Sequence, residues 1–254
     1  MVARTGIGQP DRTLRLLWRH HRPAERAARG PKQSLTVDGV VDAATRLADI
    51  DGLARLSMRR VAAELSVTAM SLYTYVPAKA ELLDLMTDAA YGELPLAPHR
   101  RAGWRRRLET VARDNLDLYA RHPWLVHVAT SRPPLGPHMM AKYEHELHAV
   151  EGLGLTDVEM DSVLTLVLEF THASARGIAE HAQTNQQTGI DDQQWWAANA
   201  PLLEKIFDAE RYPTASRVGT AAGQAYGGAS SAAHAFEFGL QRVLDGVARL
   251  IEGR

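Results

Sequence analysis

Residues 57 to 79 read SMRRVAAELSVTAMSLYTYVPAK, and this stretch decides the fold. It predicts two short helices joined by a tight turn, because Ser57 and Thr68 each stand where a hydroxyl oxygen can cap a first helical turn. One face of the first helix is apolar at helical spacing, with Val61, Ala62 and Leu65. The second helix has a single strong apolar anchor, Leu72. A helix with so little apolar surface packs weakly unless its outer face has another use.

Two helices in this order have the layout of a helix-turn-helix, in which the first helix braces and the second enters the DNA major groove. The alternative is an ordinary helical hairpin. The flanks favour DNA binding, because an amphipathic helix starts at Thr36 and ends at Gly52, and Pro77 stops the second helix. Another helix is expected over residues 79–91. The sequence therefore predicts a three-helix unit followed by a connecting helix.

Residues 35–86 closely resemble the DNA-binding domain of the tetracycline-repressor (TetR) family. Four short runs carry the resemblance in order, namely Leu56–Ala62, Leu65–Val67, Met70–Tyr73 and Val76–Lys79. The chain departs from the family at Ser66, where Gly is usual, and at Thr74 and Tyr75, where Trp and then His or Phe are common. The last two departures bear on the operator sequence rather than on DNA binding.

The N-terminal half of the second helix is expected to face the groove. The residues so placed are Thr68, Ala69, Met70, Ser71 and Tyr73, with Thr74 and Tyr75 near the groove edge. Met70 and Ala69 suit contact with thymine methyl groups, whereas the Ser71 hydroxyl can bond to several bases and so specifies weakly. Four residues are placed to hold the phosphate backbone, and the resemblance implies the same roles for them: Arg59, Tyr73, Tyr75 and Lys79.

Basic charge is concentrated before this unit. The chain of 254 residues has a net charge of −1, yet residues 1–33 carry eight basic side chains and two acidic ones. A flexible basic arm of this kind can neutralise phosphates or enter a minor groove. It can equally be a solvated extension without function, or the product of a misassigned translation start. Residues 12–19 could form a short basic amphipathic helix on contact with DNA.

Composition excludes several classes of protein. The chain has no cysteine, which removes disulfides, thiol catalysis and thiolate zinc sites. No apolar run approaches the ~20 residues that span a bilayer, and the N-terminus lacks the apolar core of a signal peptide. We therefore expect a cytoplasmic protein without a membrane partner.

The rest of the chain, residues 91–254, shows helical periodicity and no strand alternation, with a Gly-, Ala- and Ser-rich loop expected at 213–229. Residues 104–182 resemble the ligand-binding and dimerisation domain of TetR-like regulators, most clearly at Arg121–Trp124 and Arg132–Pro137. This resemblance implies a homodimer formed through two late helices, roughly 157–182 and 231–251. Their apolar and small residues suit a four-helix bundle, with Phe170, Ile178, Leu240, Phe236 and Phe238 on the contact face.

The second domain also holds many bulky residues for a purely structural bundle, among them Met139, Trp195 and Trp196. We expect some of them to line a mainly apolar pocket for a small aromatic or amphipathic effector, although plain core packing explains each one alone. The expected walls are Trp104, Trp124, Met140, Tyr143 and Phe170, and the expected polar groups are His127, Thr165, Glu169 and His172. No cofactor is expected beyond this inducer, whose identity the sequence does not give.

Enzyme and metal signatures are weak. The run His145-Glu146-Leu147-His148 is one residue short of the His-Glu-x-x-His pattern, and a solvated polar helix face explains it better than a metal site with His138, Glu144 and His172. There is no Ser-His-Asp elbow and no phosphate-binding Gly-rich loop.

Two hypotheses result. The favoured one is an all-α, non-enzymatic regulator with an arm at 1–33, a helix-turn-helix DNA-binding domain at 34–90 and a helical ligand-binding and dimerisation domain at 91–254. It would repress transcription by binding a palindromic double-stranded DNA operator as a homodimer, and a small-molecule inducer would release it. The alternative is an all-helical enzyme or metal-binding protein with an accidental resemblance to a helix-turn-helix.

Overall fold

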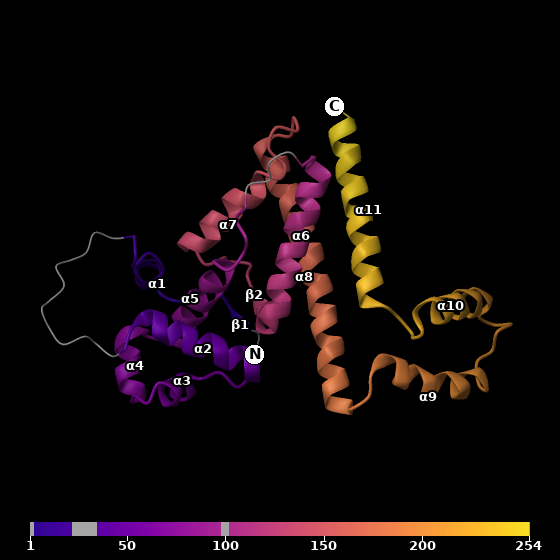
Figure 1. Ribbon diagram of the computed structural model, residues 1–254, viewed down its shortest axis with the longest axis horizontal. Coiled ribbons are helices and arrows are strands. Elements are labelled where there is room, and N and C mark those ends of the chain that lie inside the picture. The colour runs from indigo at the N-terminus through magenta and orange to yellow at the C-terminus, as the bar shows by residue number, and fades with distance from the viewer. Residues whose placement is uncertain (1–2, 22–34, 98–101, 254) are drawn as a thin grey trace, which may run out of the picture.

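The computed structural model describes residues 3–21, 35–97 and 102–253, and it is helical almost throughout (Figure 1). The predicted all-α class is confirmed. The one departure is a pair of two-residue strands, β1 (Ala3–Arg4) and β2 (Val128–Ala129), which pair in parallel. Strands this short leave no alternation in the sequence, so periodicity could not predict them.

The DNA-binding unit consists of α2 (Val37–Asp51), α3 (Met58–Glu64) and α4 (Ala69–Tyr75). The three predicted N-caps form, because the hydroxyls of Thr36, Ser57 and Thr68 each accept a backbone amide of the first turn. The turn between α3 and α4 passes through Ser66, which has a φ of 56°. This left-handed conformation explains why Gly is usual at this position in the family that the sequence resembles.

The connecting helix α5 (Lys79–Tyr91) is almost fully enclosed. It packs against α2 on one side, against α7 (Pro137–Leu147) on another, and against the N-terminal helix α1 (Pro10–Leu17). Ten of its thirteen residues are buried, including three carboxylates, Glu81, Asp84 and Asp88. The helix that joins the two domains therefore lies in the core of the molecule rather than on its surface.

The larger domain is built around α8 (Asp157–Thr188), which lies against α6 (Trp104–Arg121) and α11 (Ala232–Glu252) (Figure 1). The 3-10 helix η1 (Pro123–His127) follows α6, because Pro123 interrupts the helix. A capping box of Thr156 and Glu159 starts α8. The largest buried side chains of this core are Leu108, Leu164, Phe236, Leu240 and Leu244.

The loop expected at residues 213–229 is wrong over most of its length. Residues 213–226 form α10 (Pro213–Tyr226), which follows α9 (Asp192–Glu204) along the chain. Pro213 stands at the first helical position, alanines supply helix propensity, and Gly227 ends the helix with a φ of 64°. Neither α9 nor α10 contains a buried residue. Both helices extend away from the rest of the molecule (Figure 1).

The expectation of a flexible arm is also wrong for residues 3–21. Their helix α1 packs on α5 and buries Leu17, which is 2% exposed. The indole Nε1 of Trp18 donates to the carbonyl oxygen of Leu135 at 2.7 Å. Leu16 and Leu17 pack against the protein core, which explains the amphipathic pattern without DNA, although Leu14 is exposed. Residues 22–33 of the predicted arm lie outside the described residues.

Candidate DNA-binding surface and effector site

Helix α4 presents an outer face with large apolar side chains. Leu72 is fully buried and anchors the helix, whereas Met70 is 77% exposed and Tyr73 is 42% exposed. Thr68, Ser71 and Thr74 are also exposed. Ala69 and Tyr75, in contrast, are half-buried and pack partly against the core, so these two predicted contacts present less surface than the others.

Two of the hydroxyl groups on this face are engaged within the helix. The Ser71 hydroxyl lies 2.9 Å from the Thr68 hydroxyl, and Thr74 Oγ1 donates to the carbonyl oxygen of Met70 at 3.3 Å. Met70 and Tyr73 therefore offer most of the contact surface that α4 directs to solvent.

Of the two predicted basic phosphate contacts, Arg59 is exposed on α3. Lys79 has a structural role that the sequence did not indicate, because its Nζ donates to the carbonyl oxygens of Leu56 at 2.6 Å and Leu53 at 3.4 Å. These bonds tie the loop between α2 and α3 to the start of α5. An ammonium group has three donors, so one remains for a phosphate.

The structure divides the nine residues predicted for the effector pocket between two cores and the surface. Trp124 is buried beside the DNA-binding unit, where its Nε1 donates to Asp49 Oδ1 at 2.8 Å. Trp104 and Phe170 pack in the core of the larger domain, and the Phe170 ring stacks on Phe236 at 5.9 Å. Their bulk fills the two cores, which is the ordinary explanation that the sequence left open.

The remaining six predicted residues lie at the surface or are half-buried near it. His127, Thr165, Glu169, Met140 and Tyr143 are exposed, and the Tyr143 hydroxyl donates to Asp161 Oδ1 at 2.8 Å. The ring of His172 packs edge-on to Tyr119 at 5.5 Å, and burial lowers the pKa of this imidazole. The charges of Glu169 and His127 also act on this imidazole, so these three predicted residues lie near one another.

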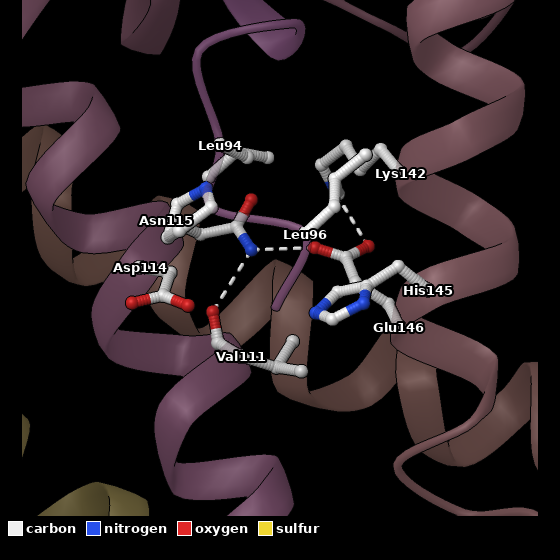
Figure 2. A pocket seen from close by; sticks show the side chains of 9 residues that line it. Leu94, Leu96, Val111, Asp114, Asn115, Lys142, His145 and Glu146 are labelled. Atoms are coloured by element: carbon white, nitrogen blue, oxygen red, sulfur yellow. Dashed lines mark hydrogen bonds and ion pairs between the residues drawn. The ribbon is translucent and has the colours of Figure 1, made fainter. Parts of the chain in front are cut away.

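A small cavity lies instead between α6, α7 and the segment after α5 (Figure 2). It has a volume of about 10 Å³, enough for about one water molecule. Its walls are formed by Leu94, Pro95, Leu96, Val111, Asp114, Asn115, Lys142, His145 and Glu146.

Three buried polar side chains form the floor of this cavity. Glu146 Oε2 accepts from Lys142 Nζ at 2.5 Å, and Glu146 Oε1 accepts from Asn115 Nδ2 at 2.6 Å, as the dashed lines of Figure 2 show. Asn115 Nδ2 also donates to the carbonyl oxygen of Val111 at 2.9 Å. The carbonyl oxygen Oδ1 of Asn115 has no hydrogen-bond partner among the described residues. The site thus offers a buried acceptor next to a buried ion pair.

These contacts correct the interpretation of residues 145–148 as a solvated helix face. Glu146 is 3% exposed and Lys142 is 5% exposed, while His145 is half-buried and burial lowers its pKa. Among the four residues of this run, only His148 is exposed. No group of three or more His, Asp or Glu side chains within the described residues is arranged to hold a metal ion.

Sequence reasoning missed Asn115 and Lys142. The signal for Asn115 was present, because this residue follows Leu108, Val111 and Ala112 on the apolar face of α6. A polar residue on a buried helix face needs a partner, and Glu146 supplies one from α7.

Helix α7 is also linked directly to the connecting helix. Asp88 Oδ1 accepts the backbone amide of Met139 at 2.9 Å, and Asp88 Oδ2 lies 3.1 Å from His138 Nδ1. Gly136 is needed for this approach, since a Cβ there would lie 2.3 Å from the Asp88 carboxyl group. The carboxylate of α5 therefore caps the N-terminus of the helix that lines the cavity.

A second junction joins the domains at the segment Arg121–Trp124. His122 Nδ1 lies 2.8 Å from Asp49 Oδ1 on α2, and His122 Nε2 lies 3.0 Å from Glu93 Oε2. Arg121 Nε lies 3.5 Å from the same Glu93 oxygen. The segment Arg121–Trp124, which the sequence assigned to the second domain, thus contacts the DNA-binding unit.

In the part of the chain that the structure describes, no helix is long and apolar enough to cross a membrane.

Comparisons with known proteins agree with this architecture. Residues 40–86 match the family of bacterial regulatory proteins called tetR, and residues 97–251 match the tetracyclin repressor-like C-terminal domain. The chain is 44% identical over 252 residues to the HTH-type transcriptional repressor DrrR1 of Streptomyces coeruleorubidus, covering 98% of this chain and 90% of that protein. It is 25% identical over 218 residues to the class E tetracycline repressor of Escherichia coli, covering 84% and 90% of the two chains.

Solved structures of the Streptomyces coelicolor protein ActR are similar as well. Apo ActR has a TM-score of 0.71 at 26% identity, covering 88% of this chain and 99% of ActR. ActR in complex with actinorhodin has a TM-score of 0.70 at 27% identity, covering 85% and 96%. With both domains matched in order over nearly the whole chain, this protein belongs to the tetracycline-repressor family of transcriptional regulators.

Proposed function

We propose that this protein is a homodimeric repressor that binds a palindromic operator through α4 and is released by a small-molecule effector. It acts by binding rather than by catalysis, in the cytoplasm where the operator lies. The observation that carries the proposal is the outer face of α4, where Met70 and Tyr73 are held at the surface by a helix whose one fully buried side chain is Leu72. Such a face fits a major groove, and two copies on a two-fold axis read two half-sites.

The dimer contact is assigned to α8 and α11, but with different residues from those first expected. Phe236 and Leu240 are 2% and 0% exposed, so they belong to the core of one protomer. Leu166 on α8 and Phe238 on α11 are 50% and 56% exposed and remain available to a second copy. Burial of these apolar side chains against their symmetry mates would close the bundle.

The effector site is assigned to the cavity between α6 and α7. Asn115 Oδ1 is a buried acceptor without a partner among the described residues, and an effector that donates a hydrogen bond to it would remove the cost of leaving it unpaired. The ActR complexes name actinorhodin and (S)-DNPA as ligands of that protein. We assign an effector of this class to the present chain, with a hydroxyl group directed at Asn115 and an anionic group near Lys142.

The first experiment selects an operator from a random pool of duplexes with the purified protein. The selected sequence should be palindromic, and binding should weaken steeply with salt because phosphate contacts release counterions. Replacing Met70 and Ser71 together by other residues should change the operator sequence that the protein selects. Ile50→Ala is the matched control, since Ile50 is 80% exposed on α2 and has no assigned DNA contact. Absence of salt-dependent duplex binding would favour the enzyme or metal-protein alternative.

The second experiment adds actinorhodin to the protein–operator complex. Release of the operator by wild type, and loss of release in Asn115→Leu with operator affinity unchanged, would support the assigned site. Binding of actinorhodin that leaves operator affinity unchanged would contradict the effector assignment and leave the DNA-binding proposal standing.

A further inference from the structure

The N-terminal segment makes contacts in both domains within eighteen residues. Its first part belongs to the larger domain, because Ala3 and Arg4 pair with Val128 and Ala129 of β2. Thr5, which is 2% exposed, continues this pairing with its amide on Ala129 O at 3.2 Å and its hydroxyl on Arg132 O at 2.7 Å.

The next part of the segment is fixed to the connecting helix. The Gly6 amide donates to Asp84 Oδ1 at 2.9 Å, and the Gln9 amide donates to Glu81 Oε1 at 3.1 Å. Both carboxylates belong to α5 and are buried. Gly8 passes so close that a Cβ there would lie 2.9 Å from Glu81 Oε1. Helix α1 then packs along α5.

The last part reaches the DNA-binding unit. Arg19 Nε donates to Asp38 Oδ1 at 3.1 Å, and His20 Nε2 lies 3.1 Å from the same oxygen. Asp38 stands in the first turn of α2. The segment therefore contacts the larger domain, the connecting helix and the DNA-binding unit in this order.

We infer that residues 3–20 form an interdomain strap that holds the DNA-binding unit in the effector-free, operator-binding orientation. This inference rests on the proposed function. A rotation of the DNA-binding unit against the larger domain would separate Asp38 from β2 and strain the bonds between them. The strap thus adds to the free energy that an effector must supply for release.

The size of the cavity identifies the orientation that the strap stabilises. The cavity has about 10 Å³, whereas drug-sized ligands occupy pockets of roughly 300–1,000 Å³. An effector of that size that binds at this cavity must therefore separate α6 from α7 before it can enter, and the packing described above is the one without such an effector. In a repressor released by its effector, the effector-free state is the state that binds the operator.

Gly6 allows a test that changes no charge. Gly6 has a φ of 66°, and a Cβ there would lie 2.6 Å from Arg132 Cβ, so Gly6→Ala should displace the strap from the larger domain. Gly154→Ala is the matched control, because Gly154 has a φ of 76° but no atom within 4 Å of its Cβ position. A second variant that starts at Ile7 removes β1, Thr5 and Gly6 and keeps α1.

A disulfide supplies the complementary test. Because the chain has no cysteine, Arg4→Cys with Ala129→Cys gives one thiol pair in a variant that also carries Gly6→Ala. These residues are paired across neighbouring strands, which brings their Cα atoms within the range that a disulfide spans. Oxidation should fix the strap again, and the reduced form of the same protein is its own control.

The measurement is affinity for the operator duplex selected by wild type, at several salt concentrations. We expect Gly6→Ala and the shortened chain to bind roughly tenfold more weakly, with an unchanged salt slope. Gly154→Ala should bind within about twofold of wild type, and oxidation of the disulfide variant should restore affinity. Circular dichroism checks that each variant is folded.

Two results would overturn the inference. If Gly6→Ala and the shortened chain both bind like wild type, the strap has no role in orientation. If the shortened chain alone loses affinity and its salt slope falls, the segment contacts phosphates directly instead. A wild-type protein that selects no operator would refute the proposed function itself, which distinguishes the two failures.

Discussion

The buried carboxyl group of Asp84 makes stability depend on pH in a direction opposite to that of most aspartates. Burial, together with the charge of the nearby Glu81, raises the pKa of Asp84 from 3.8 to about 6, although the hydrogen bond from the Gly6 amide opposes the change. A pKa that is higher in the folded than in the unfolded protein means that the folded state binds the proton more tightly. The contribution of Asp84 to stability is therefore fully present below pH 4 and is lost as the pH rises through about 6.

The magnitude follows from the size of the pKa change. A shift of about two pH units at 1.36 kcal/mol per unit makes ionised Asp84 cost up to about 3 kcal/mol at neutral pH. Asp84→Asn keeps an oxygen for the Gly6 amide and removes the charge. Relative to wild type, this variant should gain about 3 kcal/mol in unfolding free energy between pH 4 and pH 7.5, or roughly 6–12 °C in Tm for a chain of this length.

The assay compares Tm at fixed protein concentration over this pH range for wild type and for Asp84→Asn. Any cost of the new amide group that does not depend on pH is the same at each pH. The test is therefore how the Tm difference between Asp84→Asn and wild type changes with pH. Asp42→Asn is the control, because it makes the same chemical change on the exposed side of α2. Parallel Tm profiles for wild type and Asp84→Asn would refute the argument from burial.

Three further substitutions test other contacts. Ser66→Gly should raise stability by about 0.5–1 kcal/mol in thermal melts, because it relieves a left-handed serine at the cost of some backbone entropy; a lower Tm would contradict this. Glu146→Gln should cost about 3 kcal/mol in urea unfolding by leaving Lys142 buried without its carboxylate, whereas replacing both residues by Met should recover most of the loss. Phe238→Asp should give folded monomers by sedimentation, whereas Leu240→Asp should unfold the protein because Leu240 is fully buried; folded dimers of Phe238→Asp would exclude this residue from the dimer contact.

Features that depend on neighbouring residues were predictable from the sequence. The caps at Ser57 and Thr68 and the capping box at Thr156 involve atoms within three residues of each other, so their spacing is visible in the chain. The helices with a strong apolar period were found for the same reason. Helix α10 was missed because its glycines and serines suggested a loop, although its alanines favour a helix.

The candidate effector site was not predictable in this way. Large aromatic residues were chosen for their bulk, and bulk is what a core requires, so Trp124 and Phe170 were found inside the two cores. The cavity depends instead on Asn115 and Glu146, which are 31 residues apart, and the strap depends on Gly6 and Asp84, which are 78 apart. Periodicity within one helix carries no information on which helix lies opposite.

The carboxylates of α5 suggest why a modest ligand could control this protein. Glu81 and Asp84 accept backbone amides from the N-terminal strap, whereas Asp88 accepts one from α7, the helix that lines the cavity. Hydrogen bonds to charged groups contribute about 1.5–3 kcal/mol each, and allosteric coupling typically amounts to 1–3 kcal/mol. Loss of the hydrogen bond from the Met139 amide to Asp88 alone therefore matches a coupling of the usual size. Since α5 is buried along most of its length, it cannot adjust gradually, and breaking that contact should move the helix between two discrete packings.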